Sequence, residues 1–392
     1  MQNISRNHLF LLIFGICGAS AFTLSIIMLF SVLNHSTRSS THEDSPLIQG
    51  NYNRHLKIEL VAEGLFSPTS MAFLDNHKIL VLEKNTGAVR LISHGILQYK
   101  PVLKLRVDPK GERGLLGIAV LHTKNNNGYY YDNNNNNTEV FLYFTESKNK
   151  NDSNNTDDEQ LRNRVYKYDW NGQTLIDPRL VVDLPAFPGP YHNGGKLIFG
   201  PDHYLYIVIG DLAGPKTQAL NNKTGPAADG TGGILRVPQD GRPVSDPILG
   251  KKYPLKLYYA YGIRNNTVSK AELVNFPGSH YSDPVFSWYH DIGVTDIQFL
   301  NSSKLGDKYK NNLFVGDINN GNLYYFEVND NRTGLEFNAI GLKDKVADNE
   351  DGLSDIIFAS GFRGITDIET SPDGYLYILS YLDGKLYRIV PS

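Results

Sequence analysis

The chain has 392 residues, of which 41% are hydrophobic, so it can bury a large core in one or more domains. Its formal net charge is −3, acidic and basic residues are mixed along the chain, and no basic stripe occurs. This pattern excludes the usual basic surface of a nucleic-acid-binding protein. The 24 tyrosines and 36 glycines, against three methionines, favour a protein of strands and turns over a helical one.

Residues 1–34 are predicted to form a membrane anchor. The run from Leu9 to Leu33 carries no charge over 25 residues, which is long enough to cross a bilayer as one transmembrane helix. Arg6 precedes this run, whereas acidic residues accompany the arginine that follows it. We therefore expect a single-pass protein of the cell membrane, with a cytoplasmic amino terminus and an extracytoplasmic domain. Cleavage of a signal peptide near Ala21 is the alternative.

A strand–turn–strand phrase recurs beyond residues 35–55, which are rich in Ser, Thr, His and Asn and are expected to form a flexible tether. Its regular copies lie at 71–82, 197–209, 297–317 and 368–379, and less regular copies lie at 117–168 and 232–262. Repeats of about 40–60 residues, each with about four short strands, are typical of a β-propeller. We predict that residues 56–392 form an all-β, six-bladed β-propeller, which the strand Leu56–Val61 closes by pairing with the last blade.

Two insertions interrupt the repeats at 124–137 and 147–160. They are dominated by Asn and Asp, with Tyr or Lys, and they show no apolar period. We expect both to be solvated surface loops between strands.

The stretch from Tyr191 to Asp211 contains the main candidate site. Its apolar runs 197–199 and 205–209 flank a Gly-Pro-Asp-His turn, so an antiparallel hairpin is predicted, with His192 and Asp211 at its open end. Neighbouring strands lie about 4.8 Å apart, which makes a hydrogen bond between imidazole and carboxylate feasible. A carboxylate that orients a histidine is a common general base near neutral pH. A solvated loop histidine and an unrelated turn aspartate are the alternative.

Five groups of residues follow one another between residues 56 and 392: Gly64–Phe73 with Val81–Lys84, Gly111–Ala119, His192–Leu197 with Ile209–Asp211, Tyr261–Asn265, and Ser371–Ile378. In these residues and their order, the chain resembles the quinoprotein glucose/sorbosone dehydrogenases. The catalytic domain of that family is a six-bladed propeller that binds pyrroloquinoline quinone (PQQ). The resemblance therefore implies the same fold and a sugar-oxidising activity.

The resemblance also implies roles for individual residues. His192 matches the base that removes the proton of the sugar's anomeric hydroxyl as hydride passes to the quinone, and Asp211 matches its orienting carboxylate. Arg264 matches a cation that stabilises the developing quinol oxyanion. The candidates for cofactor binding are Glu112, Arg113, Arg264, Asn265 and Arg363. A structural salt bridge is the alternative for Arg264, and a loop ion pair is the alternative for Glu112 and Arg113.

The chain also departs from the family's pattern of cations. Asn319, and residues around Gly364 and Thr366, stand where sugar-oxidising members carry lysine or arginine, and Arg363 is near but out of step. A cofactor with three carboxylates needs cationic partners, so these departures weigh against quinone binding.

The sequence also leaves open whether the chain binds calcium. The family's Glu-Asn-Gly-Pro stretch, whose carbonyls help to hold calcium, does not occur between Asn265 and Trp288. Asp283, Asp291 and Asp296 could rebuild a cation site, but their spacing alone assigns no metal.

Three functions remain after this comparison. The first is a membrane-tethered, extracytoplasmic PQQ-dependent dehydrogenase that oxidises an aldose or related sugar or polyol and passes electrons to an unidentified acceptor. The second is a non-catalytic propeller that binds glycans or surface proteins through aromatic loops such as 129–131 and Trp288-Tyr289. The third is hydrolysis by the His–Asp pair with calcium. The sequence favours the first, with the binding module as its main alternative.

Overall fold

The computed structural model describes residues 45–50, 52, 55–122, 138–147, 161–213, 228–242, 244, 247–262, 283–290, 292–337, 339–348 and 350–392. The chain divides into two compact units, residues 1–45 and 46–392. The predicted membrane anchor lies outside the described residues, as do both insertions apart from Ser147. In the part of the chain that is described, no helix combines the length and the apolar character needed to cross a membrane.

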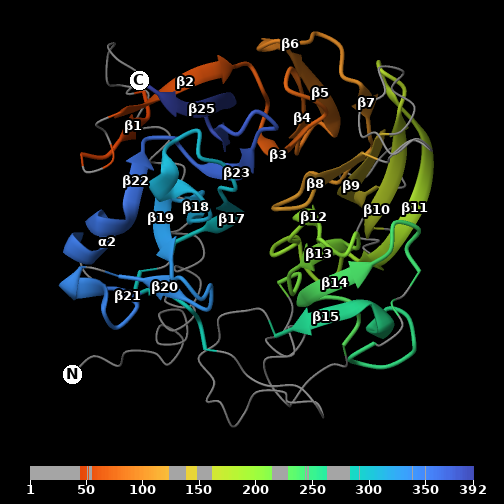
Figure 1. Ribbon diagram of the computed structural model, residues 1–392. Coiled ribbons are helices and arrows are strands. Elements are labelled where there is room, and N and C mark those ends of the chain that lie inside the picture. Colours follow the sequence, from red (N-terminus) through yellow and green to blue (C-terminus); the bar gives the residue numbers. More distant parts are fainter. Residues whose placement is uncertain are drawn as a thin grey trace, which may run out of the picture. The chain divides into compact units, whose positions relative to one another are not determined.

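Five sheets of four or more strands make up the second unit within the described residues (Figure 1). In each sheet the strands are given from the innermost outward. The first three sheets consist of β3 (Pro68–Phe73), β4 (Lys78–Glu83), β5 (Ala88–Ser93) and β6 (Ile96–Leu97), with β7 (Leu103–Lys104) beside β5; of β8 (Leu115–His122), β9 (Thr138–Glu146), β10 (Arg162–Trp170) and β11 (Leu175–Pro185); and of β12 (Leu197–Phe199), β13 (Leu205–Ile209), β14 (Gly233–Val237) and β15 (Tyr258–Tyr261). The last two sheets consist of β17 (Val294–Phe299), β18 (Leu313–Asp317), β19 (Leu323–Val328), β22 (Ile357–Ser360) and β1 (Leu47–Ile48), with β20 (Leu335–Glu336) beside β19; and of β23 (Ile365–Thr370), β24 (Leu376–Ser380), β25 (Lys385–Pro391) and β2 (Leu56–Ala62).

The burial pattern explains why these segments form stacked sheets. In β13 and β14 buried and partly buried residues alternate, as expected of a strand whose two faces differ. In β24 all five residues are buried, because neighbouring sheets cover both of its faces. Apolar clusters fill the space between successive sheets; one of them joins Leu80 of β4 to Leu142 of β9. Packing between sheets therefore supplies the core.

The innermost strands run in the same direction, and threonine hydroxyls link their starts. Thr69 Oγ1 donates to the carbonyl of Leu115 at 2.8 Å, and Thr366 Oγ1 donates to that of Pro68 at 2.9 Å. Thr295 Oγ1 donates to the carbonyl of Ile365 at 2.7 Å. The starts of β17, β23, β3 and β8 therefore lie at one end of the propeller, and their carboxyl ends lie at the other.

The closure of the propeller agrees with the prediction. β2 pairs with β25 from Leu56↔Pro391 to Ala62↔Leu386, so a strand from the start of the domain completes the last sheet. Arg388 and Glu59 add an ion pair across these two strands at 2.8 Å. The pairing removes an open sheet edge from the last blade.

The predicted number of six blades is wrong for the described residues, which form five. The copies of the repeat at 197–209 and 232–262 lie in one sheet, β12–β15, instead of two. Counting repeated phrases overestimated the blades because strands of one blade can each resemble the start of a new one.

Part of the predicted tether is ordered structure. Leu47 and Ile48 form β1 and pair with Ser360 and Ala359 of β22, and the Tyr52 ring packs against Phe358. The remaining elements of the described residues are short: the parallel pair β16 (Ser287–Trp288) and β21 (Val346–Ala347), the helix α2 (Glu350–Ile356), and the 3-10 turns η4 (Leu255–Leu257), η6 (Asp307–Tyr309) and η7 (Ile340–Leu342).

Candidate active site

The hairpin of β12 and β13 forms as predicted and brings His192 and Asp211 together. Its register pairs Leu197 with Ile207 and Phe199 with Leu205. The Nδ1 atom of His192 lies 2.7 Å from Oδ1 of Asp211. The carboxylate is 2% exposed, whereas 37% of the imidazole side chain is exposed. A carboxylate only accepts hydrogen bonds, so the contact assigns the hydrogen to Nδ1 and leaves the lone pair of a neutral ring on Nε2.

The backbone around His192 is held in a rarely adopted conformation. His192 has φ 58°, in the left-handed region, and its N–H donates to Oε2 of Glu112 at 2.5 Å. Gly210 packs directly against the same residue, since a Cβ at position 210 would lie 2.1 Å from the carbonyl oxygen of His192. A Cβ at Gly194, which has φ 69°, would lie 2.5 Å from the carbonyl oxygen of Val208. The hairpin therefore needs glycine on both strands beside the histidine.

The next residue, Asn193, anchors the loop to the neighbouring blade. Asn193 is fully buried, and its Oδ1 accepts from Nδ2 of Asn163 at 3.1 Å. The Tyr143 hydroxyl donates to its carbonyl at 3.0 Å, and burial raises the pKa of that tyrosine well above its usual range. Thr145 in turn donates to Asn163 at 2.7 Å. Strands β9 and β10 thus hold the histidine loop through a connected network of buried polar groups.

Lys196 ends the same loop and reaches three carboxylates that belong to two other sheets. Its Nζ lies 3.0 Å from Asp296 of β17, and 2.7 Å and 3.2 Å from Asp367 and Glu369 of β23. We call these four residues the Lys196 cluster. Burial opposes the lysine's charge, but the facing carboxylates hold the pKa of Lys196 well above its ordinary value. Burial also raises the pKa of Asp367 and of Glu369, whose side chain is 30% exposed, because one ammonium cannot balance three facing carboxylates.

The other predicted site residues fall into three groups. Glu112 is beside His192, as described above. The Arg113 guanidinium is 2% exposed and binds Asp108 at 3.1 Å and the carbonyl of Ala186 at 2.5 Å, which matches the loop ion pair left open by the sequence. Arg363 is mostly exposed and pairs with Asp383 at 3.0 Å. Arg264 and Asn265 lie outside the described residues, so their predicted roles stay predictions.

The predicted cation-site residues separate in the same way. Asp296 belongs to the Lys196 cluster, Asp283 is exposed, and Asp291 lies outside the described residues. Over the described part of the chain, no group of three or more His, Cys, Asp and Glu side chains is arranged to hold a metal ion.

Sequence reasoning overlooked Lys84 at this end of the propeller. Lys84 is buried, and its Nζ donates to Oδ1 of Asn85 at 2.8 Å and to the carbonyl of Pro109 at 3.3 Å. Burial lowers its pKa, and the nearby carboxylates of Glu112 and Asp108 oppose that shift. Lys84 therefore neighbours the carboxylate that binds His192. The sequence does mark Lys84, because this residue ends the matched phrase Val81–Lys84. That Lys84 lies near Glu112, however, follows only from the fold.

Comparisons with known proteins identify the family. Residues 65–275, slightly more than half of the 392-residue chain, match the family described as glucose/sorbosone dehydrogenase. The uncharacterized protein slr1608 of Synechocystis sp. is 22% identical over 96% of both chains. The aldose sugar dehydrogenase YliI of Escherichia coli is 26% identical, over 53% of this chain and 62% of that protein.

Solved structures agree with this assignment at the level of the fold. A crystal structure from Thermus thermophilus, described as a putative oxidoreductase (glucose dehydrogenase), superposes with a TM-score of 0.60 at 23% identity, over 86% of this chain and all of its own. The PQQ-bound aldose sugar dehydrogenase of Streptomyces coelicolor gives a TM-score of 0.51 at 18% identity, over 89% of this chain and all of its own. From the matched family residues, the chain belongs to the glucose/sorbosone dehydrogenase family.

Proposed function

We propose that this protein is a PQQ-dependent sugar dehydrogenase that oxidises an aldose or a related sugar or polyol. The observation that carries the proposal is the 2.7 Å contact between His192 and Asp211, within the residues that match the family. A partly exposed imidazole paired to a buried carboxylate suits proton abstraction, and the relative YliI is an aldose sugar dehydrogenase.

The chain's own residues would carry the proton in this reaction. The Nε2 atom of neutral His192 accepts the proton of the anomeric hydroxyl, and the Asp211 carboxylate stabilises the imidazolium that results. The sugar loses that proton and the hydrogen of its anomeric carbon as hydride, and becomes a lactone. When bound, the quinone supplies the acceptor for that hydride. The hydrogen bond from the backbone N–H of His192 to Glu112 and the buried contacts of Asn193 hold the loop that carries the imidazole.

PQQ has three carboxylates, and the lysine and arginine side chains that the structure describes supply only some of the positive charge needed to bind them. Arg113, Lys196 and Arg363 each bind protein carboxylates, so their charges are already balanced. The ammonium of Lys84 lies near Glu112, and its hydrogen bonds to Asn85 and to the carbonyl of Pro109 use two of its three N–H groups. We propose Lys84 as one contact to the quinone, with Arg264 and Asn265 as contacts implied by the sequence. Calcium remains a prediction of the resemblance.

A binding module is the alternative, and the same balanced charges favour it. In that case the propeller would hold a glycan or a surface protein without redox chemistry. Tyr289 is 71% exposed and could stack on such a ligand, whereas Trp288 packs against Phe286 and Tyr324 and is less suited to it.

The proposed setting is extracytoplasmic, with the uncharged run Leu9–Leu33 as a single membrane anchor. Fractionation of cells that express the full chain tests this part. Recovery in the membrane fraction, with the propeller accessible to protease only from outside, is the expected result. Recovery in the cytoplasm would contradict it.

Reconstitution with PQQ decides between the two functions. Purified protein is loaded with PQQ, with and without calcium, and dye reduction is measured over a panel of aldoses. We expect reduction that falls by at least about 10²-fold in His192→Ala, as for loss of a general base. The control is His203→Ala, since this histidine lies in the turn at the other end of the hairpin. If an absorbance titration detects no quinone binding, the dehydrogenase proposal is wrong and the binding module is favoured.

A further inference from the structure

A cavity opens at the opposite end of the propeller from His192. It has a volume of about 750 Å³ and is lined by the carboxyl ends of the inner strands β3, β8, β12 and β23 and by the turns after β17 and β23. His192 precedes β12 and Asp211 follows β13, so both lie at the start of the inner strands. We call this cavity the rear pocket. Its volume falls within the range that small-molecule sites occupy.

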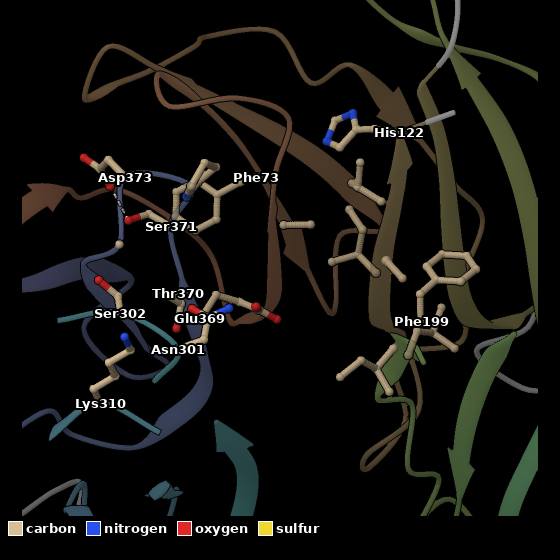
Figure 2. Close-up of a pocket in the computed structure, with 18 of the residues that line it drawn as sticks. Phe73, His122, Phe199, Asn301, Ser302, Lys310, Glu369, Thr370, Ser371 and Asp373 are labelled. Atoms are coloured by element: carbon tan, nitrogen blue, oxygen red, sulfur yellow. Dashed lines mark hydrogen bonds between the residues drawn. The ribbon is translucent and has the colours of Figure 1, made fainter. Parts of the chain in front are cut away.

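One wall of the rear pocket is apolar. Val120 comes from β8 and Phe199 ends β12, while Phe73, which ends β3, lies beside Ser371 in Figure 2. The two phenylalanine rings are fixed by edge-on contacts with inner aromatic rings, Phe73 with Tyr377 at 5.0 Å and Phe199 with Phe141 at 5.1 Å. The wall is therefore a preformed apolar surface, held by packing on the far side of each ring.

The facing wall is polar, and Figure 2 shows its side chains on the β23 side, across from Phe199. It includes the amide of Asn301, the hydroxyls of Ser302 and Ser371, and the carboxyl of Glu369. Ser302 Oγ accepts from the N–H of Lys304 at 3.1 Å, which fixes the turn after β17. Amide, hydroxyl and carboxyl groups together offer both donors and acceptors to a ligand.

The charges around the rear pocket are largely balanced. Glu369 is bound to Lys196 at 3.2 Å, and burial raises its pKa, so its negative charge is weakened in two ways. The Ser371 hydroxyl donates to the Asp373 carboxylate. Burial lowers the pKa of His122, which keeps the ring neutral at neutral pH. Asp373 and the exposed Lys310 remain as one charge of each sign. Such a lining selects a neutral ligand over an ion.

We propose that the rear pocket binds a neutral, monosaccharide-sized polyol, such as a pyranoside. A pyranose ring presents apolar C–H groups on its faces and hydroxyls around its edge. It can therefore place a C–H face on Phe199 while its hydroxyls bind Asn301 and Glu369 across the cavity. This proposal is independent of the proposed dehydrogenase activity, because the rear pocket contains neither His192 nor Asp211.

Saturation-transfer-difference NMR on the full chain tests the proposal with methyl β-D-glucopyranoside. This probe has no free anomeric hydroxyl, so the reaction proposed for His192 cannot consume it. We expect saturation transfer to its ring C–H protons, and weaker transfer to the charged methyl β-D-glucopyranosiduronate. Asn301→Ala should weaken binding about fivefold, the effect of one hydrogen bond. Phe199→Leu, which keeps an apolar side chain, should also weaken it through loss of the aromatic face.

The matched control for Asn301→Ala is Asn331→Ala, which removes another exposed asparagine away from the rear pocket. His192→Ala should retain the signal. Absence of transfer to the wild-type protein would overturn the proposal. Transfer that is lost in His192→Ala but retained in Asn301→Ala would also overturn it, because the sugar would then bind at the other end of the propeller. Tighter binding of the uronate would contradict the inferred neutrality.

Discussion

At the scale of single residues, the candidate active site depends on what surrounds one histidine. Asp211 is buried and accepts from Nδ1, so it fixes the tautomer of His192 as well as the ring's orientation. Glu112 binds the backbone N–H of the same residue and leaves the ring free to serve as the base. The two carboxylates therefore have different tasks, one on the side chain and one on the main chain.

Asp211→Asn separates orientation from the mere presence of the imidazole. The amide is nearly the same size, but its NH₂ group can donate to Nδ1 and favour the wrong tautomer. We expect kcat for aldose oxidation to fall by about 10²–10⁴-fold while KM changes little. Steady-state dye reduction by the PQQ-loaded protein measures both constants. Asp202→Asn, an exposed carboxylate in the turn of the same hairpin, is the matched control. Activity close to wild type in Asp211→Asn would show that His192 does not depend on this carboxylate.

At the scale of the elements, the hairpin β12–β13 could be predicted because its determinants are local. Its turn residues, its apolar runs and the positions of His192 and Asp211 all lie within 21 residues, 191–211. The closing strand was also predictable, because its pairing with the last blade removes an open sheet edge. The number of blades was not predictable, because no local sequence feature indicates that the copies at 197–209 and 232–262 pair within one sheet.

Side-chain partners that lie far apart in the sequence explain the remaining errors. Arg113 was a candidate cofactor contact, yet it binds the carbonyl of Ala186, 73 positions away. Lys196 drew no attention beside His192, because its partner Asp367 is 171 positions away. In the sequence, a lysine or arginine within one of the matched phrases looks the same whether its side chain faces a ligand or a buried carboxylate. Such roles become visible only when the sheets are assembled.

Gly210→Ala tests whether the hairpin positions His192 through close backbone packing. The added methyl would lie 2.1 Å from the carbonyl oxygen of His192, so one of the two strands must move. We expect the free energy of unfolding to fall by about 1–3 kcal/mol, as for overpacking, together with loss of dye reduction. Chemical denaturation measures the first effect. Gly334→Ala is the control, because its nearest neighbour would be at 3.6 Å. Unchanged stability and activity would mean that the contact is easily relaxed.

At the scale of the whole molecule, the Lys196 cluster connects three blades across the interior. Lys196 comes from the β12 sheet, Asp296 from β17, and Asp367 and Glu369 from β23. Asp367 also accepts from the backbone N–H of Met71 in β3 at 2.7 Å, and Asp296 accepts from that of Ile368 at 2.8 Å. A propeller packs mainly between neighbouring sheets, so a polar cluster that reaches across them helps to fix their relative positions.

Lys196→Met should destabilise the propeller in a pH-dependent way. Without the ammonium, three carboxyl groups face one another, and we expect a loss of about 3–5 kcal/mol at pH 8. Burial raises the pKa values of Asp367 and Glu369 in the folded protein above those of the unfolded chain. These two groups therefore stabilise the fold fully at a pH below the carboxyl pKa of the unfolded chain, and that stabilisation is lost as the pH rises through their pKa values in the folded protein. The penalty should therefore shrink at pH 5, where the facing carboxyls hold more protons. Urea unfolding at both pH values measures it, with exposed Lys343→Met as the control. An equal penalty at both pH values would show that the repulsion between these carboxyls does not limit stability.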